Sequence, residues 1–232
     1  MSKIGIIGAM DLEVNALKEA MQLETKITRA NMDFYEGTLN GANVVIVRCG
    51  IGKVNAALCT QILADCFCVT HIINTGVAGS LNAKLDIGDI VISRDAIHHD
   101  VDVTIFGYAL GEVPQIGVRE FAADKTMAEL ALKTCRKVNP DIHAIMGRVV
   151  SGDQFISDKN KKKWLIENFN GFCCEMEGAA IAQAAYLNEI PFLIVRAISD
   201  KADDSASVDY PEFEAKAIIH SVNLILEMAQ QL

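Results

Sequence analysis

The sequence predicts an α/β protein, in which helices cover both faces of one mixed, twisted β-sheet. The chain has 232 residues, and 51% of them are hydrophobic, which is enough for one large core and too apolar for a disordered chain. Short apolar runs alternate with longer segments of helical periodicity, as in sheets that are covered on both sides. No repeat, low-complexity segment or change of composition divides the chain, so we expect a single domain over residues 1–232.

Strands are expected where short apolar or β-branched runs stop at glycine or at small polar residues. Asn40-Gly41, between two such runs, is a dipeptide typical of a tight β-hairpin. The predicted strands cover residues 3–7, 34–39, 44–47, 71–74, 89–93, 144–150 and 192–198.

Helices are expected where hydrophobic residues recur every three to four positions, as Leu12, Ala16 and Leu17 do. The predicted helices cover residues 11–21, 54–63, 128–138, 159–167, 177–186 and 210–230. Residues 98–117 contain glycines and aromatic residues without periodicity, which indicates a long functional loop rather than a linker.

Composition excludes several classes of function. The 21 basic and 30 acidic residues give a net charge of 21 − 30 = −9, which opposes binding to nucleic acid or to an anionic membrane. The seven cysteines form no Cys-x-x-Cys pair, which favours buried thiols in a reducing compartment over a disulfide framework. The apolar run near the N-terminus is too short for a signal peptide, and no run reaches the ~18 residues of a membrane helix. We therefore expect a cytoplasmic protein.

Two patterns resemble cofactor sites but are incomplete. Gly50-x-Gly52-x-x-Asn55 lacks the third glycine of a dinucleotide fingerprint and the acidic residue expected ~20 positions later. His98-His99-Asp100 has no third imidazole or thiolate nearby, so we interpret it as a polar loop at the rim of a site. The sequence therefore predicts neither a cofactor nor a metal.

Carboxylates in apolar surroundings are the strongest candidates for function. Glu175 and Glu177 lie among hydrophobic residues, where an unpaired charge is rare, so we expect at least one of them to be functional. We expect that, if this segment is extended, the two side chains point to opposite faces. Arg196 interrupts an apolar strand, so we expect a structural pair with Glu175 or another acid. Asp200 follows the same strand, where ligands gather in α/β sheets, although a solvated loop aspartate is the alternative.

Several motifs, in this order along the chain, resemble those of the 5′-methylthioadenosine/S-adenosylhomocysteine nucleosidases, in the purine nucleoside phosphorylase/nucleosidase superfamily. They are Gly8-Ala9-Met10 with Glu13, Gly-Ile-Gly-Lys-Val at 50–54, Val-Thr-x-Phe-Gly-Tyr at 103–108, Ser-Gly-Asp-x-Phe-Ile at 151–156, Glu-Met-Glu at 175–177 and Arg-Ala-Ile-Ser-Asp at 196–200. The resemblance implies a mixed sheet between helices. It also implies hydrolysis of the N-glycosidic bond of 5′-substituted adenosines, a reaction of methionine salvage that releases adenine and a thioribose.

Carried over residue by residue, the resemblance implies that Glu13 activates water, Glu177 holds the ribose hydroxyls and Asp200, oriented by Ser199, serves adenine N7. The other substrate contacts that it implies come from Met10, Ile51, Val77, Ala78, Gly79, Phe155, Ile156, Met176 and Tyr210. It further implies a homodimer, in which Val103, Phe106 and Pro114 reach the site of the neighbouring subunit.

The chain departs from the family at Val77, where many relatives have serine, at Leu12, where they have an acid, and at Tyr210, where phenylalanine is common. Two alternatives stay open: a nucleoside phosphorylase, with Arg48 as the one suggestive phosphate ligand, and a non-catalytic nucleoside-binding protein. The preference among methylthioadenosine, adenosylhomocysteine, 5′-deoxyadenosine and futalosine-type nucleosides also stays open. For Glu13, the helix dipole favours ionisation and burial opposes it.

Overall fold

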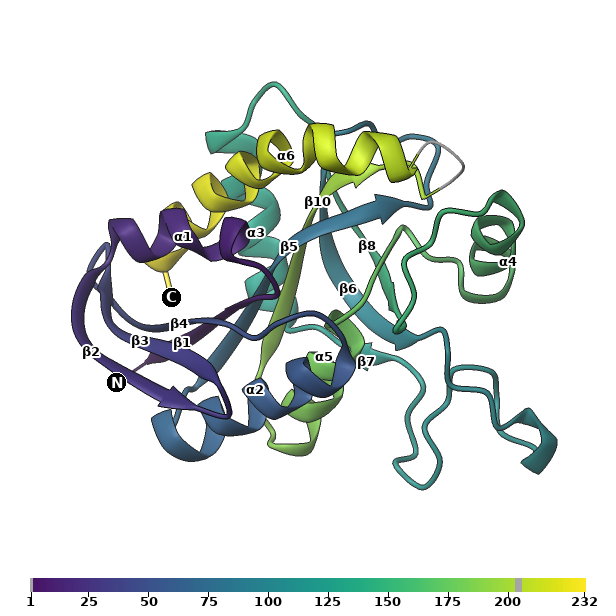
Figure 1. The fold of residues 1–232 in the computed structure, drawn as a ribbon, viewed down its shortest axis with the longest axis horizontal. Coiled ribbons are helices and arrows are strands. Elements are labelled where there is room, and N and C mark those ends of the chain that lie inside the picture. The colour runs from purple at the N-terminus through teal and green to yellow at the C-terminus, as the bar shows by residue number, and fades with distance from the viewer. Residues whose placement is uncertain (1, 203–205) are drawn as a thin grey trace.

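Helices lie on both faces of a large mixed sheet (Figure 1). The computed structural model describes residues 2–202 and 206–232, with the backbone alone for residues 207–212. One face is covered by α1 (Asp11–Ala20), α3 (Lys125–Val138) and α6 (Ala206–Ala229). The other face is covered by α2 (Lys53–Phe67) and α5 (Gly178–Leu187), while α4 (Lys159–Phe169) lies at one end of the molecule. The predicted α/β class is confirmed.

The first half of the sheet is a parallel core with an antiparallel extension. β1 (Lys3–Gly8) pairs in parallel with both β4 (Ala42–Arg48) and β5 (His71–Ser80). The hairpin of β2 (Gln22–Arg29) and β3 (Met32–Leu39) continues the sheet beyond β4. At the turn between β3 and β4, Asn40 and Gly41 both have positive φ, as the predicted hairpin requires.

The second half of the sheet curls into a closed ring. β10 (Phe192–Asp200) pairs with β5 on one side and with β6 (Ile90–His98) on the other. β6 pairs with β8 (Ala144–Ser151), and β8 pairs with β9 (Cys173–Glu175), which returns to β5. A short strand, β7 (Phe121–Ala122), pairs with β6. Because Asp200 pairs with Gly79, and Gly79 with Cys174, the ends of three strands meet at one mouth of the ring.

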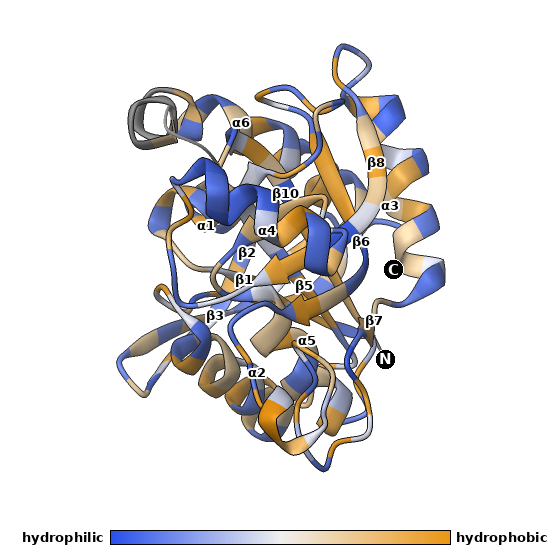
Figure 2. Cartoon of the chain, turned by 90° about the vertical axis from the view of Figure 1, so that its right-hand side faces the viewer, coloured by the Kyte–Doolittle hydropathy of each residue, from blue (hydrophilic) through white to orange (hydrophobic). Residues whose placement is uncertain are grey.

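Hydrophobic residues on both faces of the sheet explain why it is sandwiched. Every residue of β10 is buried, which is the pattern of a central strand covered on two sides. One hydrophobic cluster packs beneath α2 and α5, and a second packs beneath α1, α3 and α6. In Figure 2, hydrophobic residues follow β5 and β8, whereas α1 shows the viewer a hydrophilic surface.

The predicted strand ends were the main errors. The strands expected at 71–74, 89–93 and 192–198 continue to Ser80, His98 and Asp200, because their small and polar end residues are buried and paired in the ring. The strand β2 was missed because most of its side chains are exposed, which leaves no apolar face to recognise. The three-residue β9 was considered only as an extended segment.

The long loop expected at 98–117 is present between β6 and β7. It contains one short 3₁₀-helix, η1 (Thr104–Phe106), and it extends away from the body of the molecule (Figure 1). The side chains of Ile105 and Phe106 at its tip are 87% and 78% exposed. The loop therefore presents apolar groups to the outside rather than to its own core.

Three further observations bear on the class of protein. All seven cysteines are free, and Cys66 and Cys68 are exposed, so the expected burial of the thiols applies to the other five. Among the described residues, no group of three or more metal-binding side chains is placed to hold an ion. Within the same residues, no helix has the length and apolar character to cross a bilayer.

Candidate active site

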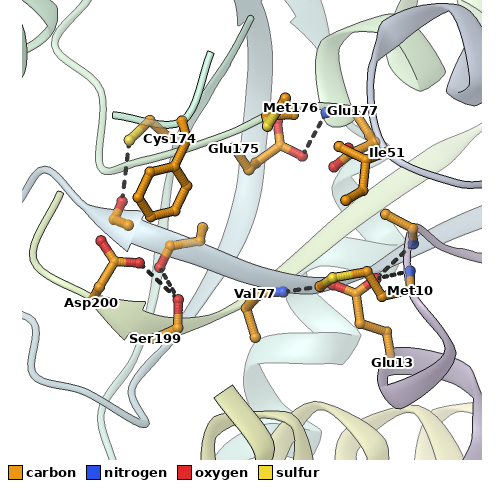
Figure 3. A pocket seen from close by; sticks show the side chains of 14 residues that line it. Met10, Glu13, Ile51, Val77, Cys174, Glu175, Met176, Glu177, Ser199 and Asp200 are labelled. Atoms are coloured by element: carbon orange, nitrogen blue, oxygen red, sulfur yellow. Dashed lines mark hydrogen bonds between the residues drawn. The ribbon is translucent and has the colours of Figure 1, made fainter. Parts of the chain in front are cut away.

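A cavity of about 360 Å³ opens at the mouth of the strand ring (Figure 3). Eleven of the predicted catalytic and substrate-binding residues line it, together with Ala9, Cys174 and Glu175, which was predicted to pair with Arg196. Those eleven are Met10, Glu13, Ile51, Val77, Ala78, Gly79, Phe155, Met176, Glu177, Ser199 and Asp200. The lining is mostly apolar but contains four carboxylates, and within the described part of the chain it contains no lysine, arginine or histidine. Its size and composition suit a small organic ligand.

Glu13 folds back from the first turn of α1 into the cavity. Its Oε2 accepts hydrogen bonds from the N–H groups of Ala9 and Met10 at 2.6 and 2.9 Å, and its Oε1 accepts one from Val77 at 3.1 Å. A glutamate at the third helical position commonly reaches back in this way, because the first N–H groups of a helix lack partners. Backbone donors thus fix the Glu13 carboxylate, which is 3% exposed.

Burial raises the pKa of the Glu13 carboxyl above its ordinary value, although Arg196 and the three N–H donors lower it in part. Burial therefore outweighs the combined effect of Arg196 and the backbone donors on this pKa. Gly76 makes this arrangement possible: a Cβ there would lie 2.2 Å from Glu13 Oε1 and 2.3 Å from Arg196 Nη1. Glycine is required at this position by the close approach of two charged groups.

Arg196 and Glu175 form a buried pair beneath the cavity. The Arg196 guanidinium donates to Glu175 Oε2 and, at 2.5 Å, to Asn74 Oδ1, and its side chain is 1% exposed. Glu175 also accepts hydrogen bonds from Ser151 Oγ and from Gly178 N. Burial alone would lower the pKa of Arg196, but the neighbouring carboxylates raise it, so the guanidinium stays charged. The Glu175 carboxylate is therefore engaged with Arg196, Ser151 and Gly178.

Glu177 stands at the N-terminus of α5, two residues after Glu175. Its Oε1 accepts a hydrogen bond from Gly52 N at 2.8 Å, and its Oε2 lies 3.8 Å from Arg196 Nη2. The expectation that the two glutamates point to opposite faces is wrong, because residues two apart in an extended segment share one face, and both glutamates line the cavity. Burial, followed by the charge of Glu175, raises the pKa of Glu177 to about 7.

Asp200 is the last residue of β10 and lies at the other end of the cavity from Glu13 (Figure 3). Its Oδ2 accepts a hydrogen bond from Ser199 Oγ at 2.9 Å, and its Oδ1 accepts one from Ala202 N at 2.7 Å. Its exposure is 2%, so the alternative of a solvated loop aspartate is wrong. Serine next to Asp200 therefore helps to set the direction of its carboxyl group.

Four predicted substrate-contact residues, Ile156 and three residues of the long loop, do not line the main cavity. Ile156 lines a smaller hollow of about 40 Å³ that shares Phe155 and Asp200 with it. Val103, Phe106 and Pro114 belong to the loop that extends from the body and do not line the cavity of their own chain. Tyr210 is in α6, but its side chain lies outside the described residues.

Backbone donors were the contributions that sequence reasoning missed. The N–H groups of Ala9, Val77 and Gly52 bind two of the carboxylates, and an N–H group leaves no trace in residue type. The sequence held one signal of these donors, the glycine at position 52. Its φ is +97°, a conformation that favours glycine. The incomplete fingerprint Gly50-x-Gly52 is therefore part of a turn that binds a carboxylate.

Comparison with known proteins agrees with this geometry. A family model described as the phosphorylase superfamily matches residues 3–230. The 5′-methylthioadenosine/S-adenosylhomocysteine nucleosidase of Anoxybacillus flavithermus is 44% identical over 230 residues, which are 99% of this chain and 98% of the relative. The nucleosidase structure from Colwellia psychrerythraea, in complex with adenine, is 40% identical with a TM-score of 0.96, covering 100% of this chain and 96% of that one.

The futalosine hydrolase of Helicobacter pylori has the same fold, with a TM-score of 0.94 and 30% identity, and the match covers 100% of this chain and 98% of that one. This chain is therefore more similar in sequence to the Anoxybacillus flavithermus nucleosidase, at 44% identity, than to the futalosine hydrolase, at 30%. This chain belongs to the phosphorylase superfamily and, within it, to the family of 5′-methylthioadenosine/S-adenosylhomocysteine nucleosidases.

Proposed function

We propose that this protein hydrolyses the N-glycosidic bond of 5′-methylthioadenosine, S-adenosylhomocysteine and 5′-deoxyadenosine, releasing adenine and the 5-substituted ribose. One observation supports this most strongly: Glu13, Glu177 and Asp200 are distant in the chain yet line one mostly apolar cavity. Relatives of this chain are named as nucleosidases, and one was solved with adenine bound. Three carboxylates in three environments match the three tasks of such a hydrolysis.

Asp200 is proposed as the acid at the adenine end. Adenine is a poor leaving anion, so cleavage requires a proton or a strong hydrogen bond at N7. The Ser199 hydroxyl and the Ala202 N–H hold the two oxygens of Asp200, which directs the carboxyl group. Phe155, which also lines the cavity, provides an aromatic face for the purine. A protonated Asp200 then transfers its proton to N7 as the C1′–N9 bond breaks.

Glu177 is proposed to hold the ribose. As the bond to adenine breaks, the sugar acquires positive, oxocarbenium-like character, which a nearby carboxylate stabilises, as in glycoside hydrolysis by analogy. The anionic Glu177 accepts hydrogen bonds from the ribose hydroxyls, while Gly52 N–H and Arg196 fix its position. Its carboxylate therefore both binds the sugar and favours the charge that develops on it.

Glu13 is proposed as the base that activates water. A carboxylate has about four acceptor positions, and three on Glu13 are taken by backbone N–H groups. The fourth is available to a water molecule in the cavity. That water attacks C1′ from the face opposite adenine, and its proton passes to Glu13, whose raised pKa makes it a better base than an exposed glutamate.

The phosphorylase alternative is disfavoured by the charges at the site. Phosphate is bound by convergent cationic groups, but none of the described residues that line the cavity carries a positive charge. Arg196 is engaged with Glu175, and Arg48 lies near Asp11 outside the cavity, with its Nε 3.4 Å from Asp11 Oδ1. A binding protein without catalysis is disfavoured because burying three carboxylates is costly unless they are used.

The proposed function is tested by chromatographic detection of free adenine from a panel of adenosine thioethers, 5′-deoxyadenosine and futalosine-type nucleosides. We expect adenine to be released from methylthioadenosine at the same rate with and without inorganic phosphate. Release only in the presence of phosphate would show a phosphorylase. Tight binding of all panel members without any release would show a non-catalytic binding protein.

The raised pKa of Glu177 predicts how activity depends on pH. Below about pH 7 its carboxylate takes up a proton in the free enzyme and no longer accepts two hydroxyl hydrogen bonds. We therefore expect kcat/KM to fall as the pH is lowered through about 7, and to level off above it. The measurement is a pH–rate profile in phosphate-free buffers. Glu177→Gln removes the titrating group, so an unchanged acidic limb in that variant would assign the limb to another residue.

We further propose that the protein acts as a homodimer in the cytoplasm and serves methionine salvage. The exposed apolar tip of the 98–117 loop supports the dimer, because Ile105 and Phe106 find no core in their own chain. In this arrangement Val103, Phe106 and Pro114 complete the 5′ end of the neighbouring site. The single domain over residues 1–232 and the contribution of Tyr210 belong to the same proposal.

A further inference from the structure

Lys53, Asp100 and Asp153 form a closed polar cluster beside the cavity, which we call the rim cluster. Lys53 is the first residue of α2, Asp100 follows β6 and Asp153 follows β8. Lys53 lies within the incomplete dinucleotide fingerprint, Asp100 ends the His98-His99-Asp100 pattern, and Asp153 lies in the loop that leads to Phe155. None of them lines the main cavity, so the catalytic roles proposed above leave them unexplained.

Each member of the rim cluster is bonded to the other two. Lys53 Nζ donates to Asp100 Oδ1 at 2.6 Å, Lys53 N donates to Asp153 Oδ1 at 2.8 Å, and Asp153 N donates to Asp100 Oδ2 at 3.0 Å. The side chains of Lys53 and Asp100 are both 20% exposed, so their ion pair is largely shielded from solvent. Burial alone would raise the pKa of Asp100, but its hydrogen bonds to Lys53 and Asp153 lower it overall.

The rim cluster connects directly to the proposed ribose-binding carboxylate. Gly52 and Lys53 have consecutive N–H groups: the first donates to Glu177 in the cavity, and the second donates to Asp153 outside it. Gly52 caps α2 but has no side chain with which to bind the helix N-terminus, and the Asp153 carboxylate supplies that acceptor from another loop. The position of Asp153 therefore helps to fix the peptide that carries the Gly52 N–H.

Glu177 depends strongly on this one donor. In the part of the chain that the structure describes, Gly52 N–H makes the hydrogen bond to the Glu177 side chain, while Arg196 Nη2 lies 3.8 Å away. A Cβ at Gly52 would lie 3.0 Å from Asp153 Oδ1, so the turn and the rim cluster are in close contact. A small movement of Asp153 would displace the donor from Glu177.

We propose that Lys53, Asp100 and Asp153 are positioning residues for the reaction, which hold the Gly52 N–H against Glu177 and so fix the carboxylate that binds the ribose. This inference depends on the role given to Glu177 under the proposed function. It also explains the Asp153 and Asp100 positions in their motifs without a metal or a dinucleotide.

The test compares Asp153→Ala with a matched control, Asp158→Ala. Asp158 Oδ1 accepts from Lys161 N at 2.8 Å at the start of α4, so both variants remove one carboxylate from a helix N-terminus. We expect similar losses of thermal stability in both variants. Only Asp153→Ala should lose kcat/KM, by roughly tenfold to a hundredfold, the usual effect of a hydrogen bond to a charged group. Asp153→Asn keeps an acceptor oxygen and should restore most of the activity.

Two further readouts separate positioning from simple loss of structure. The acidic limb of the pH–rate profile should move to higher pH in Asp153→Ala, because the Gly52 N–H bond lowers the pKa of Glu177. In a Glu177→Gln background, the loss caused by Asp153→Ala should largely disappear, since the two changes act on one interaction.

The outcomes distinguish failure of the positioning role from failure of the proposed function. If Glu177→Gln is impaired while Asp153→Ala behaves like Asp158→Ala, the rim cluster is structural and the positioning role is wrong. A full loss from Asp153→Ala that persists in the Glu177→Gln background would overturn it as well. If Glu177→Gln alone turns over substrate at the parent rate, the assigned role of Glu177 fails first.

Discussion

Asp200→Asn is expected to stop adenine release while leaving ligand binding intact. The amide keeps the shape of the carboxyl group and can still donate a hydrogen bond to N7, but it has no proton to transfer to the departing base. The expected loss in kcat is ~10²–10⁴-fold, the range for removal of a general acid. The measurement is the initial rate of adenine release, together with calorimetric binding of adenine.

The matched control is Asp124→Asn, since Asp124 Oδ1 accepts from Met127 N at 2.8 Å at the start of α3, away from the cavity. That variant should hydrolyse substrate like the parent protein. Parent-like turnover in Asp200→Asn would show that the acid is another group. Loss of adenine binding along with turnover would indicate that Asp200 shapes the pocket rather than supplying a proton.

Glu13→Gln is expected to lose turnover to a similar degree, ~10²–10⁴-fold, because an amide cannot accept a proton from water. The three backbone N–H groups around Glu13 all need acceptors, and glutamine provides only one oxygen, so some local rearrangement is expected as well. Glu13→Asp, which keeps the charge but shortens the reach, separates the two effects. The measurement is single-turnover adenine release, with thermal unfolding as a check on the fold.

Glu19→Gln is a suitable control for this variant, because Glu19 lies on the exposed face of α1. It should be indistinguishable from the parent in rate and stability. Unchanged turnover in Glu13→Gln would remove Glu13 from the mechanism. Rescue in Glu13→Asp would instead show that charge, and not reach, is the requirement at this position.

Much of the sheet was predictable because burial on two faces requires continuous apolar runs. The strand at 192–198 is an example, whereas the hairpin was predictable from its turn dipeptide, Asn40-Gly41. The closure of the ring was not predictable, because it depends on the three residues of β9 and on small residues near Gly76 that carry little strand signal. Exposed edge strands such as β2 have no apolar face, so the hydrophobic pattern of the sequence does not predict them.

The site was predictable in its side chains and unpredictable in its backbone. Glu13, Glu177 and Asp200 were recognisable through family motifs, and all three line one cavity. Their partners are largely N–H groups, such as those of Gly52 and Ala202, whose direction is set by turn geometry rather than by residue type. The expected pairing of Arg196 with Glu175 or another acid is confirmed for Glu175.

The polar network under the cavity ties together the same strands that close the ring. Arg196 belongs to β10, Glu175 to β9, Asn74 to β5 and Ser151 to β8, and hydrogen bonds join all four. One group of atoms therefore both stabilises the closed ring and contributes to the electrostatic potential in the cavity. Substitutions there cannot tune one property alone. The tip of the long loop, η1 (Thr104–Phe106), lies outside this network, so we expect substitutions of the exposed Ile105 and Phe106 to leave the ring closed.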